Sequence, residues 1–218
     1  MTTAHHPTES WLIRYAAGRL PDSFRRVIQS HVSVCQECRE AVEDATELSA
    51  LMCLAMRGNR LGFDVKRFVN DLDDEDVDGR SIAARDADSE ADFGGVVEQL
   101  LAVGGEQTLR WRAAGRGMSY VRLRTDDDMG RLWLLRAEPG TVLPEHGHRG
   151  DELTLVLKGA YFNRERLFKA GDIEEADDTV EHKPVVASDE PCICLAATDA
   201  PLRFRGWVPR LAQSVIRL

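Results

Sequence analysis

The chain has 218 residues, of which 43% are hydrophobic and 30% charged, and its formal net charge is −9. It contains no run of eighteen apolar residues and no basic-then-apolar N-terminal pattern, so we expect a cytoplasmic protein without a membrane segment or secretory signal. No cluster of Lys/Arg with interleaved aromatic residues is present, which argues against direct binding of nucleic acid.

The negative charge is concentrated in one segment. Residues 71–92 carry ten Asp/Glu against two Lys/Arg, whereas residues 1–70 have a net charge of +1 and residues 93–218 of −2. A segment so acidic and so poor in large apolar residues cannot bury enough surface to offset the entropy of ordering it. We therefore predict a flexible linker at 71–92 between a domain at 1–70 and a domain at 93–218.

The first domain has apolar residues at helical spacing. Gly18 and Pro21 separate the first two helical segments, and Asp22 or Ser23 is available to cap the second. The predicted helices cover residues 11–16, 24–32, 36 to about 57, and 61–72. This part of the chain is expected to form an all-α bundle.

The second domain has a different pattern. After a short apolar helix at 96–103, short segments rich in β-branched, aromatic and aliphatic residues alternate with Gly, Asp and Pro. The predicted strands lie within residues 108–114, 119–125, 130–137, 153–162 and 192–197. Many short strands with turns between them indicate an all-β sandwich or barrel.

The stretch HVSVCQECR places one histidine and two cysteines on one side of a helix. His31, Cys35 and Cys38 fall within roughly 60° of one another at helical geometry, and they offer three of the four ligands of a tetrahedral zinc site. A fourth ligand must come from elsewhere, and either His5 or His6 could supply it. Packing of a helix face is one alternative, and a disulfide between the two cysteines under oxidation is another.

The cysteines do not suggest a disulfide framework. Their number is odd, five, and they occur as two close pairs plus a single residue. Cys53 is expected to be a buried packing residue of a helix. Cys192 and Cys194 alternate along a strand, where a disulfide would be strained, so we predict ordinary core cysteines with a thiol sensor as the lesser alternative.

A second histidine cluster lies in the β half. The full spacing of the first motif of the cupin family is matched by Gly140, His146, His148, Glu152 and Gly159, and His182 follows in a second motif. His146 and His148 share a face of one strand, and Glu152 arrives from the next. Three imidazoles and a carboxylate suit zinc, iron, manganese or nickel. The alternative is three surface histidines with ordinary partners.

The combination of both clusters resembles, over essentially the whole chain, the ChrR-type zinc anti-sigma factors. The stretches that carry the resemblance occur in order: YAAGRL, HVSVCQECR, PEHGHRGDELTLVLKGAY, AGDIEEAD and CICLAATDAPLRF. The resemblance implies an all-α zinc-binding bundle followed by an all-β cupin, a double-stranded β-helix or jelly-roll barrel. It also implies that zinc is held by His6, His31, Cys35 and Cys38, and that zinc or another divalent transition metal in the cupin is held by His146, His148, Glu152 and His182.

The same resemblance implies a function. The helical domain would bind an extracytoplasmic-function sigma factor in a 1:1 complex and keep it from core RNA polymerase, and the cupin would be needed for release under singlet oxygen or organic hydroperoxides. The apolar helix residues available for the partner, or equally for an internal core, are Leu48, Leu51, Met52 and Met56. We expect a protein that is not an enzyme. The alternative is a metal-dependent cupin enzyme of the dioxygenase or isomerase type.

Overall fold

The computed structural model describes residues 3–61, 110–201 and 203–204, with side chains described only up to residue 53 in the last helix. The predicted linker at 71–92 and the predicted helices at 61–72 and 96–103 lie outside these residues. The domain boundaries at 70 and 93 therefore stay predictions.

The described part of residues 3–61 contains three helices: α1 (Glu9–Ala16), α2 (Asp22–Val34) and α3 (Gln36–Leu61). The first connection turns at Gly18, whose φ of 64° is a left-handed conformation that glycine adopts without steric cost. Only Cys35, with extended backbone, separates α2 from α3. The helical periodicity of the sequence thus correctly predicted all three helices.

The predicted cap of α2 is wrong. The N-cap position is Pro21, and Asp22 is the first helical residue. The carboxylate of Asp22 instead pairs with Arg26, at 2.8 Å from Nε, and also with Arg25. The backbone N–H of Asp22 donates to Asp127, at 2.8 Å, so the carboxylate at this helix end comes from a loop 105 residues later in the chain.

The described residues from 110 to 204 form three antiparallel sheets. Six strands form the largest, in the order β1-β2-β3-β11-β5-β8, and the two smaller sheets have the orders β10-β6-β7 and β12-β4-β9. The strands are β1 (Arg112–Gly115), β2 (Met118–Leu123), β3 (Arg131–Ala137), β4 (His146–Gly147), β5 (Glu152–Lys158), β6 (Ala160–Asn163), β7 (Arg166–Lys169), β8 (Ile173–Ala176), β9 (Glu181–His182), β10 (Val185–Val186), β11 (Cys192–Thr198) and β12 (Arg203–Phe204).

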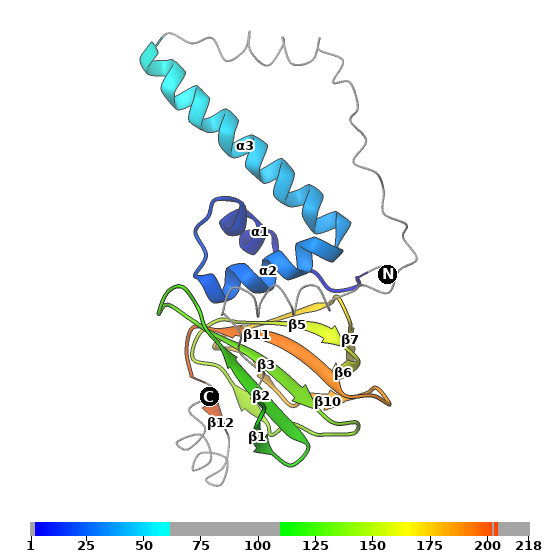
Figure 1. The fold of residues 1–218 in the computed structure, drawn as a ribbon. Helices are drawn as coiled ribbons and strands as arrows, with labels where there is room; N and C mark the ends of the chain where they lie inside the picture. The colour runs from blue at the N-terminus through cyan, green and yellow to red at the C-terminus, as the bar shows by residue number, and fades with distance from the viewer. Residues whose placement is uncertain (1–2, 62–109, 202, 205–218) are drawn as a thin grey trace.

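Helix α2 packs on one face of the six-stranded sheet, and α1 packs against α2 and α3 (Figure 1). Alternate residues of the central strands, among them Leu134, Leu155 and Leu195, belong to the same buried cluster as Phe24 and Ile28 of α2. The opposite face of the sheet carries a second buried cluster that includes Tyr161, Phe168 and Cys194. The central strands are therefore apolar on both faces, and one hydrophobic core joins the helices to the sheet.

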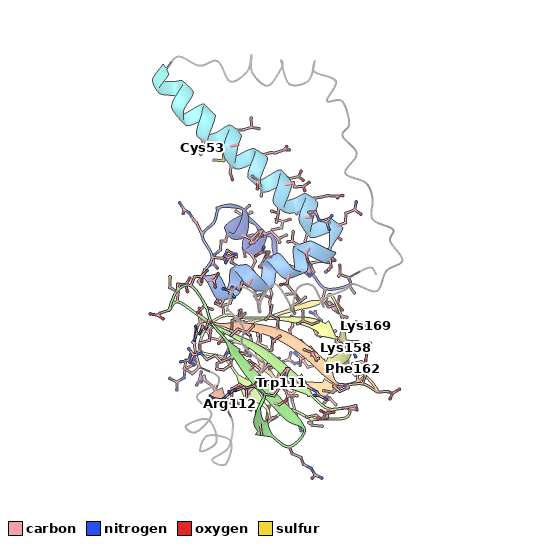
Figure 2. The ribbon with its side chains drawn as sticks, viewed as in Figure 1. Cys53, Trp111, Arg112, Lys158, Phe162 and Lys169 are labelled. Carbon is pink, nitrogen blue, oxygen red and sulfur yellow. The ribbon has the colours of Figure 1, made fainter. Side chains whose placement is uncertain are left out.

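Helix α3 packs against α1 and α2 with its first turns and then leads away from the rest of the molecule (Figure 1). Leu48 and Met52 on this helix are each 59% exposed. Cys53 is exposed as well (Figure 2), so the prediction that it is buried is wrong. Its part of α3 has no neighbouring element among the described residues to cover it.

Candidate metal centres

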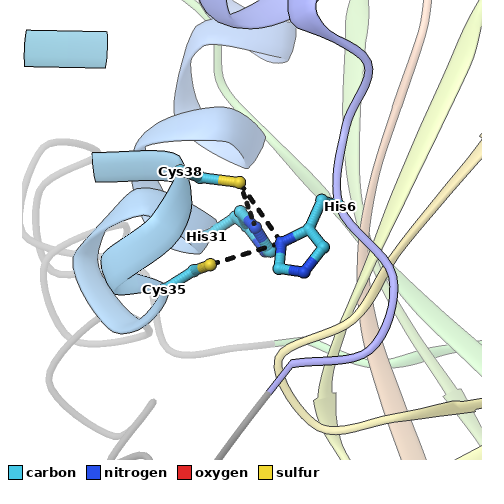
Figure 3. Close-up of side chains that lie close together, drawn as sticks. All are labelled: His6, His31, Cys35 and Cys38. Carbon is cyan, nitrogen blue, oxygen red and sulfur yellow. Dashed lines mark hydrogen bonds between the residues drawn. The ribbon is translucent and has the colours of Figure 1, made fainter. Parts of the chain in front are cut away.

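The first centre consists of His6, His31, Cys35 and Cys38, whose ligand atoms all lie within 4.8 Å of one another (Figure 3). His6 Nδ1 is 3.3 Å from the Sγ atoms of both cysteines, and His31 Nε2 is 3.3 Å from Sγ of Cys38. The end of α2, the start of α3 and the N-terminal segment meet there. All four side chains that the sequence predicted for this site are brought together.

The structure distinguishes His6 from His5. His5 turns toward the β part, where its ring lies 4.4 Å from that of Phe168 and its Nε2 donates to the carbonyl oxygen of Leu167 at 3.2 Å. His6 faces the two thiols. Of the two histidines between which the sequence could not decide, His6 is the one in position to bind a metal.

The donor set and spacing of this centre fit zinc. With Zn–S bonds of about 2.3 Å and Zn–N bonds of about 2.05 Å, tetrahedral angles place nitrogen and sulfur ligands about 3.5 Å apart. The three nitrogen–sulfur distances of 3.3 Å are close to that value. Two thiols and two imidazoles also form one of the usual ligand sets of structural zinc.

Oxygen atoms outside the centre hold its imidazoles. Nδ1 of His31 donates to the carbonyl oxygen of Gly171 at 2.8 Å, which leaves the lone pair of Nε2 pointing at Cys38. Nε2 of His6 is 3.4 Å from Glu37 Oε2, so Nδ1 is the nitrogen available to the centre. Such contacts fix the tautomer and the orientation of metal-binding histidines.

Burial of the ligand side chains shifts their pKa values and so determines which protons a metal must displace. It lowers the pKa of His31 to about 4, so this imidazole is neutral at pH 7 and ready to bind. Burial, together with the neighbouring Cys35, raises the pKa of Cys38 to about 12. A metal entering the site therefore has to displace a thiol proton, and binding becomes weaker as the pH falls.

The second centre consists of the three buried histidines His146, His148 and His182. His182 Nε2 lies 2.9 Å from Nε2 of His146 and 3.1 Å from Nε2 of His148. His146 of β4 and His182 of β9 are directly paired across two strands, and His148 follows β4. The sequence correctly predicted that these three side chains converge.

Each Nδ1 of the second centre contacts an oxygen. His146 Nδ1 donates to the carbonyl oxygen of Pro144 at 2.9 Å, and His182 Nδ1 is 3.2 Å from Glu174 Oε1. His148 Nδ1 is 3.4 Å from Glu152 Oε2. All three Nε2 lone pairs can therefore face a common point.

The spacing of the three Nε2 atoms fits a metal with ligand positions beyond the imidazoles. Metal–nitrogen bonds of about 2.1 Å give N···N separations of about 3.0 Å at right angles and about 3.4 Å at tetrahedral angles. The observed 2.9 and 3.1 Å match the right-angled arrangement. Ions that accept five or six ligands satisfy it.

Glu152 takes a different place from the three histidines. Its carboxylate contacts His148 Nδ1 and accepts a hydrogen bond from Thr154 at 3.0 Å, and it is absent from the group of ligand atoms within 4.8 Å of one another in the described part of the chain. Although burial opposes it, His148 lowers the pKa of Glu152, and Glu152 in turn raises that of His148. Direct binding of a metal by Glu152 stays a prediction.

The chain is similar to known proteins over its whole length. The family described as ChrR Cupin-like domain matches residues 101–201. The anti-sigma-E factor ChrR of Cereibacter sphaeroides is 37% identical to this chain, over the full length of both.

The chain belongs to the ChrR family.

Two solved structures are similar to this chain over different shares of its length. A chain of the crystal structure of Rhodobacter sphaeroides SigE in complex with the anti-sigma ChrR matches with a TM-score of 0.64 and 34% identity, over 91% of this chain and 100% of that one. An RmlC-like cupin protein from Ralstonia eutropha reaches a TM-score of only 0.41 at 18% identity, over 46% of this chain and 69% of its own.

The match to ChrR confirms the family predicted from the sequence. It also confirms the predicted fold class, helices followed by a cupin-like β domain. In the described residues, no helix is both long and apolar enough to span a lipid bilayer.

A buried carboxylate beside the second centre of this ChrR-family chain, that of Glu174, was not predicted from the sequence. The carboxylate of Glu174, in β8, accepts hydrogen bonds from Tyr161, at 2.5 Å, and from Asn163, and it contacts His182. The sequence signal for Glu174 is its position next to the apolar Ile173. Because Ile173 faces the helices, Glu174 faces the opposite side of the strand.

The second cysteine pair lies in the core, as predicted. Cys192 and Cys194 are both buried, with their sulfur atoms 3.7 Å apart. The contact with Cys192 and burial raise the pKa of Cys194 well above its usual value. Cys192 and Cys194 are free cysteines that form no disulfide, and a thiol held in its protonated form is a poor nucleophile.

Proposed function

We propose that this protein is a cytoplasmic anti-sigma factor that binds an extracytoplasmic-function sigma factor in a 1:1 complex and keeps it from core RNA polymerase. The observation that carries this proposal is the likeness, over nine tenths of the chain, to a chain in the complex of SigE with the anti-sigma ChrR. We propose further that residues 1–70 form the sigma-binding domain, 71–92 a linker and 93–218 the cupin domain.

The projecting part of α3 supports a role in binding a protein partner. Leu48 and Met52 are one helical turn apart, so they lie on the same side of the helix, and both are more than half exposed. An amphipathic helix that places such residues in an apolar groove is a common mode of recognition, and methionine adapts to grooves of different shape. The alternative, that these two residues form an internal core, does not fit their exposure.

We propose zinc for the first centre, held by His6, His31, Cys35 and Cys38. When bound, zinc supplies bonds that tie the N-terminal segment to the junction of α2 and α3, which stabilises a small helical domain. For the second centre we propose zinc or another divalent transition metal, held by His146, His148 and His182. Glu152 orients His148 and is the candidate for a further ligand.

The role of the β domain in this proposal is release of the sigma factor under singlet oxygen or organic hydroperoxides. Its buried imidazole centre can change occupancy or ligand set without altering α3 directly. With the His/Cys centre kept loaded by added zinc, a His182→Ala variant is therefore expected to bind sigma factor as wild type does, and in stressed cells to fail to release it. Loss of sigma binding in this variant would contradict a separation of the two roles.

A pull-down with the purified sigma factor tests the binding proposal. Leu48→Asp places a charge in the exposed apolar face of α3 and is expected to reduce capture at least tenfold. Ser49→Asp adds the same charge at the neighbouring exposed position and serves as the matched control. The double variant Cys35→Ala and Cys38→Ala should also lose capture. If Leu48→Asp and the double cysteine variant both recover as much sigma factor as wild type, neither α3 nor the zinc centre takes part in binding.

A cupin enzyme is the second candidate function. The right-angled spacing of three imidazoles favours it, because such a metal retains positions for a substrate. Turnover of an oxidisable or isomerisable compound by the metal-loaded protein, abolished in His146→Ala, would establish it. We propose the regulatory function because the likeness to the SigE–ChrR complex covers the helices as well as the cupin-like domain.

A further inference from the structure

The turn between β7 and β8 reaches the first centre. The carbonyl oxygen of Gly171 accepts the hydrogen bond of His31 Nδ1 at 2.8 Å in a buried environment. Thus a backbone group of the β domain sets the direction in which His31 presents its other nitrogen. Residue 171 lies 140 positions after the histidine that it orients.

The next residue, Asp172, holds the segment that carries His6. Its Oδ1 accepts hydrogen bonds from the backbone N–H groups of Ala4, at 2.7 Å, and His5, at 3.2 Å. The N–H of Ile173 donates to the carbonyl oxygen of His5 at 3.1 Å. Asp172 is only 2% exposed, and its Oδ2 accepts from the N–H of Lys169, so its carboxylate is rigidly placed.

Two residues further on, the same strand reaches the second centre. Glu174 is buried, and its Oε1 is 3.2 Å from His182 Nδ1. Because successive side chains of a strand point to opposite faces, Ile173 packs toward the helices while Glu174 points to the imidazoles. Residues 171–174 span only about 10 Å, since an extended strand rises about 3.3 Å per residue.

These contacts join the two centres through one backbone segment, with a hydrogen bond of 2.8 Å to His31 at one end and a contact of 3.2 Å to His182 at the other. A displacement of His182 changes the position favoured by Glu174, and a paired β-strand transmits such a displacement along its backbone better than a flexible loop would. At its other end the strand positions His31 directly and the backbone next to His6 through Asp172. The two centres therefore share one structural element although they belong to different parts of the fold.

We propose that residues 171–174, the β8 link, couple the two centres, so that occupancy of the three-histidine centre slows the loss of metal from the His/Cys centre. This inference rests on the proposed metal binding at both centres and deepens the proposed regulation. To the extent that the slower loss reflects a higher affinity, linkage requires occupancy of the His/Cys centre to raise the affinity of the three-histidine centre by that same factor.

Cobalt(II) is a suitable probe because only a thiolate-bound ion gives the sulfur-to-cobalt charge-transfer absorption. The full chain is loaded with cobalt, a chelator is added, and the decay of this absorption reports loss from the His/Cys centre alone. In His146→Ala, which empties the other centre and leaves residues 171–174 unchanged, the decay is expected to be about fivefold faster than in wild type.

The link itself is tested by a double-mutant comparison. In an Asp172→Asn background, which removes one acceptor of the link, the effect of His146→Ala is expected to shrink toward onefold. Ala4→Pro removes the N–H that donates to Asp172 without altering the β domain, and it should act in the same direction. Asp189→Asn, an exposed carboxylate in the loop between β10 and β11, is the control and should preserve the fivefold effect.

Equal decay rates in wild type and His146→Ala, with both centres shown by metal analysis to bind cobalt in wild type, would overturn the coupling. Sigma capture measured on the same preparations separates this failure from failure of the anti-sigma proposal. An absent charge-transfer band in wild type would overturn the coupling together with the assignment of the first metal centre.

Discussion

At the scale of single residues, every histidine of the two centres has one ring nitrogen facing the centre and the other near an oxygen. Backbone carbonyls of Gly171 and Pro144 serve two of the rings, and carboxylates serve the other three. This arrangement selects one tautomer for each ring before a metal arrives. The reorientation that binding would otherwise require is thereby reduced.

Glu174 offers the sharpest test of that arrangement. Glu174→Gln keeps the size of the side chain but removes the charge that holds the Nδ1 proton of His182, so metal affinity of the three-histidine centre should fall about 10- to 100-fold. A competitive metal titration measures it. Glu175→Gln, the next residue on the opposite face of β8, is the control, and equal affinities for both variants would show that Glu174 has no part in positioning His182.

The cysteines should differ sharply in reactivity. Cys53 is exposed, whereas Cys194 is buried and its pKa is raised, so at pH 8 its thiol stays protonated and unreactive. With native protein, iodoacetamide should label Cys53 within minutes and Cys192 or Cys194 only after unfolding, as peptide mass spectrometry can follow. Rapid native labelling of the core pair would mean that β11 opens readily.

At the scale of elements, α2 contains a buried ion pair between Asp22 and Arg26, and Asp22 also accepts a hydrogen bond from the loop after β2. Asp22 and Arg26 are 4% and 6% exposed, and the N–H of Asp126 donates to Asp22 at 3.1 Å. Arg26→Ala leaves the Asp22 carboxylate without its buried partner and should lower the free energy of unfolding by about 3 kcal/mol. Urea denaturation measures the loss.

Arg25→Ala is the matched control for this ion pair. Arg25 also contacts Asp22, but 41% of its side chain is exposed, so its removal should cost less than about 1 kcal/mol. If the two variants lose the same stability, burial of Arg26 adds nothing to the pair.

Elements with a strong local pattern were predictable from the sequence, and elements stabilised by remote partners were not. Helical periodicity identified α1, α2 and α3, and short apolar runs between turn residues identified strands such as β3 and β11. Strand β8, with the sequence IEEA, has no such pattern. Its glutamates are held by Tyr161 and by Thr8, which are distant in the chain. The cap of α2 was mispredicted for the same reason.

The candidate site divides in the same way. Motif spacing pointed to His146 and His148 of the second centre and to three of the four residues of the first, because residues so close in sequence cannot lie far apart, and a second motif pointed to His182. The choice between His5 and His6 depends on Phe168, and the orientation of His31 depends on a backbone carbonyl. A carbonyl group carries no sequence signature, since every residue has one.

At the scale of the whole molecule, the helices and the sheet share one hydrophobic core. Leu155 of β5 is fully buried in the cluster that also contains Ile28 of α2. Leu155→Ala should therefore lower the free energy of unfolding by about 2–5 kcal/mol for both parts together. Leu48→Ala, on the exposed side of α3, should change it by less than about 0.5 kcal/mol.

Thermal unfolding followed by far-ultraviolet circular dichroism for the helices, and by hydrogen exchange for the sheet, measures this effect. The two signals should shift by the same amount in Leu155→Ala. Two separate transitions, of which only that of the sheet moves, would show that the helices fold independently of the strands.

The length of α3 has a consequence for the first metal centre. A helix of 26 residues is about 39 Å long. Cys38 lies in the first turn of α3, so the first centre is at the base of this helix and is the pivot for any tilt of it. The outer part of the helix extends away from the rest of the molecule. A tilt of about 10° at this pivot displaces the far end by about 7 Å. A ligand rearrangement too small to disturb the core is thus amplified, along one rigid helix, into a movement larger than a side chain.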